Sequence, residues 1–211
     1  MNIKLQKGFT LVEIAIVLVI VGLLIGGVLK GQEMITNAKL KRIESDNAGI
    51  AAAMFSYQDR YLQLPGDDGD ADSRFDSYTS TDNGDGDGII QGAWAPTAGT
   101  EVETQKFWRH LRAAGLIPGG KTDNTQPTNA YGGKIGVRDG ALGISGHVTI
   151  FGQIEGPIAK IIEARLDDGK PNAGRMQAGI TSGSAKIDMD LASSGSASYS
   201  DSERYNLAFR L

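Results

Sequence analysis

The 211-residue chain has no cysteine, only two histidines and no proline before Pro65. Without cysteine, a domain exported to an oxidising compartment has no disulfide to stabilise it, and a bound metal is the alternative. His110 and His147 have no spaced partners typical of a zinc or catalytic site, so both are expected to be structural. P-loop and nucleophile-elbow motifs are also missing, and an enzyme is therefore not expected.

The chain also lacks the positive charge of a nucleic-acid-binding protein. Its 21 Lys and Arg residues oppose 25 Asp and Glu residues, for a net charge of −4. Basic residues cluster only briefly, at Lys39, Lys41 and Arg42. Proteins that bind a phosphate backbone gather positive charge on one surface. Nucleic acid is therefore not an expected partner.

A long apolar run extends from Phe9 to Leu29, and Glu13 is its only charged residue. The run has the ~20 residues that a helix needs to cross the hydrocarbon layer of a membrane. A charged side chain at the centre of such a helix costs roughly 2.5 to 3.5 kcal/mol, so Glu13 requires an explanation. Lys4 and Lys7 precede the run, and the positive-inside rule keeps them in the cytoplasm.

Two ordinary membrane-directed segments fit this run only in part. A secretory signal peptide has an apolar core of roughly 7 to 15 residues and an A-x-A-like cleavage site, whereas this run is longer and no A-x-A follows it. A simple transmembrane anchor fits the length. It leaves Glu13 unexplained, and it does not explain why no polar linker follows the run.

The stretch "KGFTLVEIAIVLVIVGLL" resembles the amino-terminal signature of type IV pilins and pseudopilins, which is a basic leader ending in Gly followed by Phe-Thr-Leu-Val-Glu and an apolar helix. In that family a prepilin peptidase cleaves after the glycine, here Gly8, and methylates the new terminal amine, here that of Phe9. The resemblance implies that residues 1–8 are a leader peptide. It also implies that Glu13 becomes the fifth residue of the mature chain and pairs with the terminal amine of a neighbouring subunit during filament assembly.

The same resemblance implies partners and a location. The precursor is expected in the inner membrane, where it meets the peptidase and an assembly platform. It then joins other pilin subunits, as a homo- or hetero-oligomer, in a filament on the cell surface or in the periplasm. Three roles stay open: a pilus subunit, a pseudopilin of a type II secretion system, and a minor pilin acting in adhesion or DNA uptake.

A single long helix is expected to continue beyond the apolar run. Its apolar residues recur at helical spacing on one face, and Leu64-Pro65-Gly66 ends it. The residues of this face are Ile43, Ile50, Met54, Tyr57 and Tyr61. The sequence thus predicts a transmembrane and assembly helix at 9–30, an extramembrane continuation at 31–62 and a globular head at 63–211.

The stretch "STDNGDGDGII" places oxygen-bearing side chains on alternate residues, as in the first eight positions of an EF-hand calcium loop. Trp94 stands where an EF-hand supplies its bidentate glutamate, so Glu101 or Glu103 would have to provide that ligand. The alternative is a solvated Asp/Gly-rich turn. The candidate calcium ligands are Asn83, Asp85, Asp87 and the carbonyl of Ile89.

The rest of the head is expected to be α+β, with an antiparallel sheet over the long helix. One helix is predicted within 100–115, with Thr100 and Glu103 as a capping box and Gly115 at its end. A second opens at Pro157 and closes at Gly169, and residues 193–202 are expected to form a mobile loop. Strands are predicted at 132–140, 143–154, 185–191 and 205–211.

Overall fold

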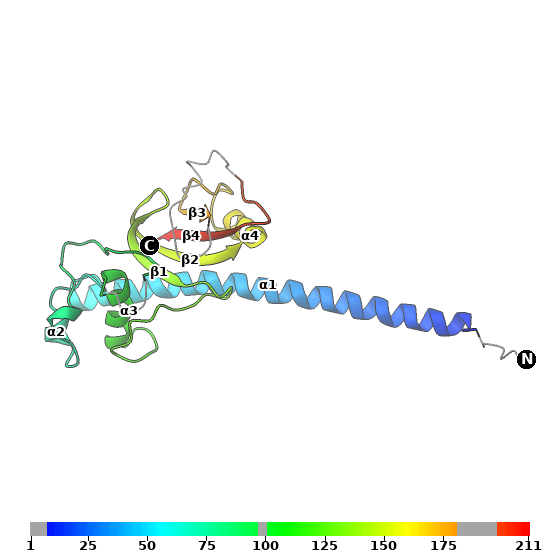
Figure 1. Ribbon diagram of the computed structural model, residues 1–211, viewed down its shortest axis with the longest axis horizontal. Helices are drawn as coiled ribbons and strands as arrows, with labels where there is room; N and C mark the ends of the chain where they lie inside the picture. The colour runs from blue at the N-terminus through cyan, green and yellow to red at the C-terminus, as the bar shows by residue number, and fades with distance from the viewer. Residues whose placement is uncertain (1–7, 97–100, 181–197) are drawn as a thin grey trace, which may run out of the picture. The chain divides into compact units, whose positions relative to one another are not determined.

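The structure is a computed structural model that describes residues 8–96, 101–180 and 198–211 (Figure 1). The chain divides into two compact units, Met1–Lys39 and Leu40–Leu211. The helices are α1 (Leu11–Tyr61), α2 (Ala71–Arg74), the 3-10 turn η1 (Ser80–Asp82), α3 (Glu103–Ala113) and α4 (Gly156–Leu166). The strands are β1 (Ile135–Ala141), β2 (Ile144–Glu155), β3 (Met176–Ile180) and β4 (Arg204–Arg210).

In the first unit, the apolar run forms a helix without interruption, as expected of a segment without proline. Its large apolar side chains between Leu11 and Leu29 are all exposed. Among the described residues, α1 is long and apolar enough to cross a membrane, judged by length and composition. The helix starts at Leu11 and not at the predicted Phe9, because Thr10 is its N-cap residue and lies just before the first helical residue.

In the second unit, the predicted apolar face of α1 is confirmed. Ile43, Ile50, Met54 and Tyr57 are buried and Tyr61 packs partly against the same core. The helix stops at Tyr61, and Leu62 takes a positive φ of 57° while its amide still bonds to the Gln58 carbonyl at 2.8 Å. The predicted stop before Pro65 is therefore also confirmed.

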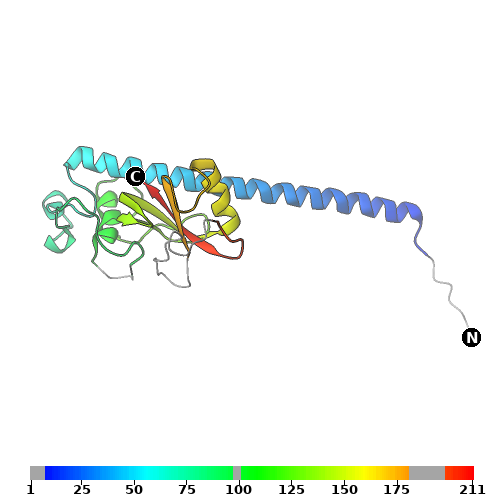
Figure 2. The same ribbon diagram turned by 90° about the horizontal axis from the view of Figure 1, so that it is seen from above.

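The sheet has the order β1-β2-β4-β3, and all of its neighbouring strands are antiparallel. One face, which includes Val137, Phe151 and Leu207, shares a core with α1, α3 and α4. The opposite face, which includes Val148 and Ile150, packs against Trp94. Both views show the sheet and α4 beside the second-unit part of α1 (Figures 1 and 2).

The predicted α+β class is thus confirmed, with two differences in the strands. The predicted strands at 132–140, 143–154 and 205–211 correspond to β1, β2 and β4, whereas the one at 185–191 lies outside the described residues. Strand β3 was not predicted from the sequence, because its five residues follow a turn that contains glycine and include a glycine themselves. It forms because β4 offers it a complete antiparallel register.

The ends of α3 and α4 also differ in part from expectation. Glu103 is the first residue of α3 rather than its third, so the predicted capping box is wrong, and Thr100 lies outside the described residues. Gly115 closes α3 as predicted. It has a φ of 71°, and Leu116 N–H donates to the Leu111 carbonyl at 2.9 Å, as in a Schellman motif. Pro157 lies in the first turn of α4, which ends earlier than predicted.

Candidate functional site

The amino-terminal site begins with a reciprocal pair of side chains at the start of α1. The Glu13 carboxylate oxygen Oε2 accepts hydrogen bonds from the amide and the hydroxyl of Thr10, each at 2.8 Å. Thr10 Oγ1 accepts the Glu13 amide at 3.2 Å. This is a capping box, which satisfies two amides that a helix start leaves unpaired. The T-x-x-E spacing was readable in the sequence, but only Glu13 was singled out there.

The capping box gives Glu13 a physical role within one subunit. A helix start carries partial positive charge, so a carboxylate is favoured there. The second oxygen of Glu13, Oε1, receives no hydrogen bond from the described residues. One oxygen therefore caps the helix, while the other stays open to a cationic group.

The Gly8–Phe9 bond lies just ahead of this box, in backbone without regular secondary structure. Both residues are exposed, and the exposed fraction of Phe9 is 84%. A peptidase needs such an accessible bond outside regular secondary structure. The geometry is thus compatible with cleavage at the predicted position.

The second candidate site is a cluster of three carboxylates from separate parts of the head. Asp67, Asp85 and Glu103 each place one oxygen within 4.8 Å of the others. Asp67 and Glu103 are buried, whereas Asp85 is exposed. Asp85 and Glu103 were among the ligands predicted from the sequence, whereas Asp67 was not, since nothing in "LPGDDGDADS" distinguishes a buried aspartate from a solvated one.

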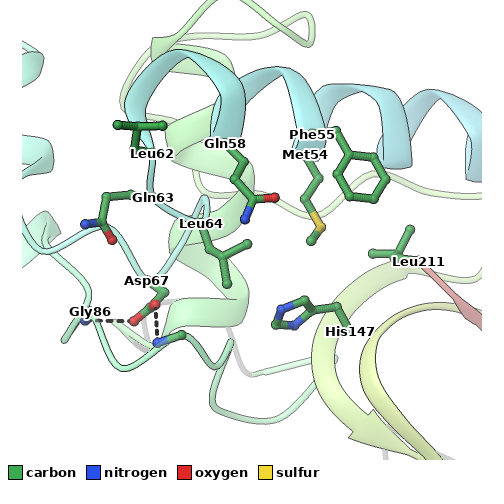
Figure 3. Close-up of a pocket in the computed structure, with 11 residues that line it drawn as sticks. Met54, Phe55, Gln58, Leu62, Gln63, Leu64, Asp67, Gly86, His147 and Leu211 are labelled. Carbon is green, nitrogen blue, oxygen red and sulfur yellow. Dashed lines mark hydrogen bonds between the residues drawn. The ribbon is translucent and has the colours of Figure 1, made fainter.

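Asp67 and Glu103 organise the acidic loop by accepting its backbone amides. Asp67 accepts the amides of Gly86 at 2.8 Å, Asp87 at 3.1 Å and Gly88 at 2.8 Å, and Figure 3 shows it facing this loop. Glu103 accepts those of Asp85 at 3.1 Å and Gln91 at 2.8 Å. Asp67 also lines an open cleft of about 380 Å³, with His147 and Leu211 across from it (Figure 3).

Of the predicted ligands, the structure brings only Asp85 into the cluster. Asn83 exchanges hydrogen bonds with Asp72, through its side-chain oxygen at 2.9 Å and its nitrogen at 3.0 Å. Asp87 accepts the Ile89 amide at 2.8 Å and the Gln91 side chain at 2.6 Å. Of the two glutamates proposed to complete the site, Glu103 joins Asp85.

The donor set of this cluster fits a hard cation, because all three members are carboxylates. Burial raises the pKa values of both Asp67 and Glu103, while the backbone amides oppose the shift. The charge of Asp85 raises the pKa of Glu103 further. Like charges held this closely favour either a shared proton or a bound cation.

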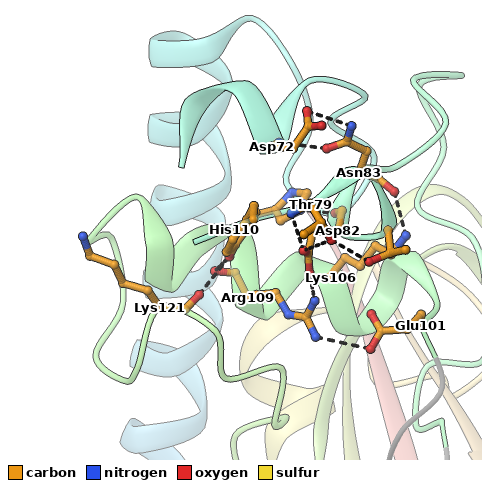
Figure 4. A network of polar contacts seen from close by, with 11 residues as sticks. Asp72, Thr79, Asp82, Asn83, Glu101, Lys106, Arg109, His110 and Lys121 are labelled. Atoms are coloured by element: carbon orange, nitrogen blue, oxygen red, sulfur yellow. Dashed lines mark hydrogen bonds and ion pairs between the residues drawn. The ribbon is translucent and has the colours of Figure 1, made fainter. Parts of the chain in front are cut away.

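A polar network anchors the start of the acidic loop to α3 (Figure 4). Arg109 forms an ion pair with Asp82, whose other oxygen accepts the Thr79 amide at 2.8 Å. Burial works against the charge of Asp82, but the Thr79 bonds and the Arg109 guanidinium hold its pKa below the usual value. Lys106 donates to the Asn83 carbonyl at 2.6 Å.

The two histidines occupy different settings in the head. His110 is fully buried; its Nδ1 accepts the Gly66 amide at 3.0 Å, and its Nε2 lies 2.9 Å from the Asp82 carbonyl. Both contacts suit a neutral ring protonated at Nε2. Burial lowers the pKa of His110 to about 4. His147 lies beside Asp139, with its Nδ1 at 3.3 Å from the carboxylate.

Comparison with known proteins points to the amino-terminal site. Residues 3–29 match the family model described as the prokaryotic N-terminal methylation motif. No curated protein and no solved structure matches the chain. The matched segment includes Gly8, Phe9 and Glu13, which the resemblance had singled out. The chain therefore carries, at its amino terminus, the signature of type IV pilins and pseudopilins.

Proposed function

We propose that this protein is a structural subunit of a type IV pilin-like or pseudopilin filament. It is made as an inner-membrane precursor, cut by prepilin peptidase after Gly8 and methylated at Phe9. The observation that carries the proposal is the methylation motif at residues 3–29. The exposed apolar side chains of α1 support it, because such a surface needs lipid in the precursor and neighbouring subunits in the filament.

The Thr10–Glu13 box suggests how one subunit accepts the next. Cleavage after Gly8 leaves the box intact and creates a positive amine at Phe9. The open oxygen Oε1 of Glu13 then pairs with the amine of a neighbouring subunit. A subunit without such an amine leaves this carboxylate uncompensated in an apolar setting, which selects for processed partners.

Mass spectrometry of the protein purified from its native host tests the proposal directly. The expected amino terminus is N-methyl-Phe9. An intact Met1, or a cut near Gly31 after the apolar run, would contradict it. Material from a host strain without the peptidase is the control and should retain the leader.

The filament type needs a separate experiment, because pilus and secretion filaments share this signature. Deletion of the gene should remove surface fibres if the protein belongs to a pilus, and should block protein export if it is a type II pseudopilin. A minor pilin would instead leave some fibres but reduce adhesion or DNA uptake. The neighbouring genes, which encode either pilus or secretion components, provide an independent assignment.

We further propose that Asp67, Asp85 and Glu103 bind calcium. Their oxygens lie within the spread of one coordination sphere, and no ion pair connects any of the three to a basic side chain in the described part of the chain. A bound ion would tie the acidic loop to α3 in a head that has no disulfide. Calcium titration of the full-length protein tests this proposal.

A further inference from the structure

A second group of carboxylates lies at the carboxyl end of α4. Glu163, Asp167 and Asp168 each place one oxygen within 4.8 Å of the others. Calcium binds oxygen ligands at about 2.3 to 2.6 Å, so two of its ligands are at most about 5 Å apart. The three oxygens are therefore close enough together to coordinate one calcium ion.

Glu163 supplies an independent observation in favour of a cation site. The residue is 1% exposed, and its Oε2 accepts a hydrogen bond from the Tyr199 hydroxyl at 2.7 Å. Its Oε1 is buried and has no hydrogen-bond partner among the described residues. Buried polar atoms in native proteins nearly always have a partner, because leaving one unpaired is costly. An ion next to Asp167 and Asp168 would give Oε1 that partner.

In each of the two aspartates, one carboxylate oxygen accepts a hydrogen bond and the other does not. Asp167 Oδ2 accepts the Met176 amide at 2.8 Å, and Asp168 Oδ1 accepts the Lys170 amide at 2.9 Å. Within the described ranges, neither second oxygen receives a hydrogen bond. Gly174 lets the chain pass close to Asp167, since a Cβ there would lie 2.0 Å from Oδ2. Outer hydrogen bonds of this kind orient the carboxylates that ligate metals.

The charge balance around this group also favours a cation. A helix carboxyl end carries partial negative charge, and acidic side chains one turn apart repel each other. The two basic side chains of α4 pair elsewhere, Lys160 with Asp201 at 2.6 Å and Arg165 with Glu44 at 3.9 Å. Burial raises the pKa of Glu163 to about 7, Asp167 and Asp168 act in the same direction, and the Tyr199 bond opposes them.

We propose that Glu163, Asp167 and Asp168 bind a divalent cation of calcium size. The ion would join the end of α4 to the turn that leads into β3 and, through Tyr199, to the segment before β4. Tyr199 falls in the stretch predicted to be a mobile loop, yet it is buried. This site is distinct from the Asp67 cluster, and it does not depend on the proposed filament role.

The test is calcium titration by isothermal calorimetry on full-length, chelator-treated protein in detergent at pH 8, where Glu163 is largely ionised. Asp85→Asn serves as the background, because it removes a ligand of the other cluster. Glu163→Gln and Asp168→Asn are each added to it. Glu163→Gln keeps an acceptor for Tyr199, and Asp168 is exposed, so its variant leaves the core untouched. Asp76→Asn, which alters an exposed acid outside the group, is the matched control.

We expect the Asp85→Asn protein to retain one calcium-binding event. Either added substitution should weaken that event at least tenfold, and Asp76→Asn should leave it unchanged. No calcium heat in the Asp85→Asn background would overturn the proposal. Equal affinity in the background and in both double variants would overturn it as well. Circular dichroism of each variant verifies that the fold is retained.

Discussion

Thr10 and Glu13 hold each other at the start of α1 through three hydrogen bonds, with the Glu13 carboxylate as the acceptor in two of them. All three bonds lie beyond the Gly8–Phe9 bond, so removal of the leader does not break them. The carboxylate that assembly is expected to use is thus already oriented in a single subunit. Orientation before contact lowers the entropy that a partner must lose on binding.

The first prediction concerns the charge of Glu13. We expect Glu13→Ala and Glu13→Gln to insert into the membrane at least as well as the native chain, because the apolar run loses its one charge. Assembly should fail or become indiscriminate in both, because neither side chain can neutralise a terminal amine. Immunoblots of sheared filaments and of membrane fractions measure how much of each variant is assembled and how much stays in the membrane.

Thr10→Val is the matched control for this prediction, since it removes the hydroxyl but keeps the charge of Glu13. Losing a cap costs a helix about 0.5 to 2 kcal/mol, so a milder assembly defect is expected. Normal incorporation of Glu13→Gln into filaments would show that the charge pair is dispensable. A Thr10→Val defect as severe as that of Glu13→Gln would assign the role to capping.

The second prediction concerns the cleavage site. Gly8→Ala should slow removal of the leader, and bulkier residues at position 8 should block it, because the peptidase must accommodate the residue just before the cut bond. The precursor should then accumulate in the membrane with residues 1–8 attached, visible as a slower band on gels. Full processing of a Gly8→Leu variant would contradict the assigned site. Gly22→Ala, within the apolar run, is the control.

Local features explain what the sequence predicted well. The apolar run, the cleavage signature and the helix stop before Pro65 each depend on residues close together in the chain. The structure contains the predicted long helix and its stop, and the family model matches the cleavage signature. Gly115 also revealed the end of α3, because a left-handed residue is needed there. A single helix or strand can be predicted from the sequence because the spacing of its apolar side chains follows the period of that element.

Contacts between residues far apart in the chain could not be predicted from the sequence in the same way. The carboxylate partners of Asp85 come from Asp67 and Glu103, each 18 positions away along the chain. The EF-hand spacing favoured Asn83 and Asp87, but Asn83 instead bonds to Asp72. Strand β3 owes its existence to its pairing with β4. Such arrangements depend on which segments the fold brings together, and one sequence does not encode that in its spacing.

The third prediction concerns calcium at the Asp67 cluster. In a Glu163→Gln background, which removes the other proposed site, calcium should raise the melting temperature of the full-length protein, and EGTA should reverse the rise. Calcium at a hundredfold above Kd adds about 2.7 kcal/mol, or roughly 5 to 10 °C for a domain of this size. Asp85→Asn should abolish the effect.

Asp87→Asn distinguishes the two possible ligand sets at this cluster. The geometry predicts that it leaves most of the calcium effect intact, because Asp87 lies outside the group of three. A loss equal to that in Asp85→Asn would instead favour the EF-hand-like set of Asn83, Asp85, Asp87 and Ile89. A melting temperature that changes with neither calcium nor EGTA would show that the loop is a solvated acidic turn without a bound ion.

The fourth prediction concerns stability at low pH. His110 has a pKa of about 4 in the folded chain against a reference of 6.5, chiefly because it is buried. The unfolded chain therefore takes up this proton first, and stability that is present above pH 6.5 is lost as the pH falls towards 4. A shift of this size corresponds to about 3 kcal/mol. Chemical denaturation of the full-length protein across this range measures it.

The neighbouring carboxylates also titrate in this range, so the contribution of His110 is the difference between the native chain and His110→Gln. Glutamine has both an acceptor for the Gly66 amide and a donor for the Asp82 carbonyl, yet it does not titrate. We expect the variant to be less stable at pH 7 but to lose less stability on acidification. His147→Gln, which leaves His110 in place, should keep the full loss. If His110→Gln follows the native pH profile in parallel, protonation of His110 does not limit the stability of the head in acid.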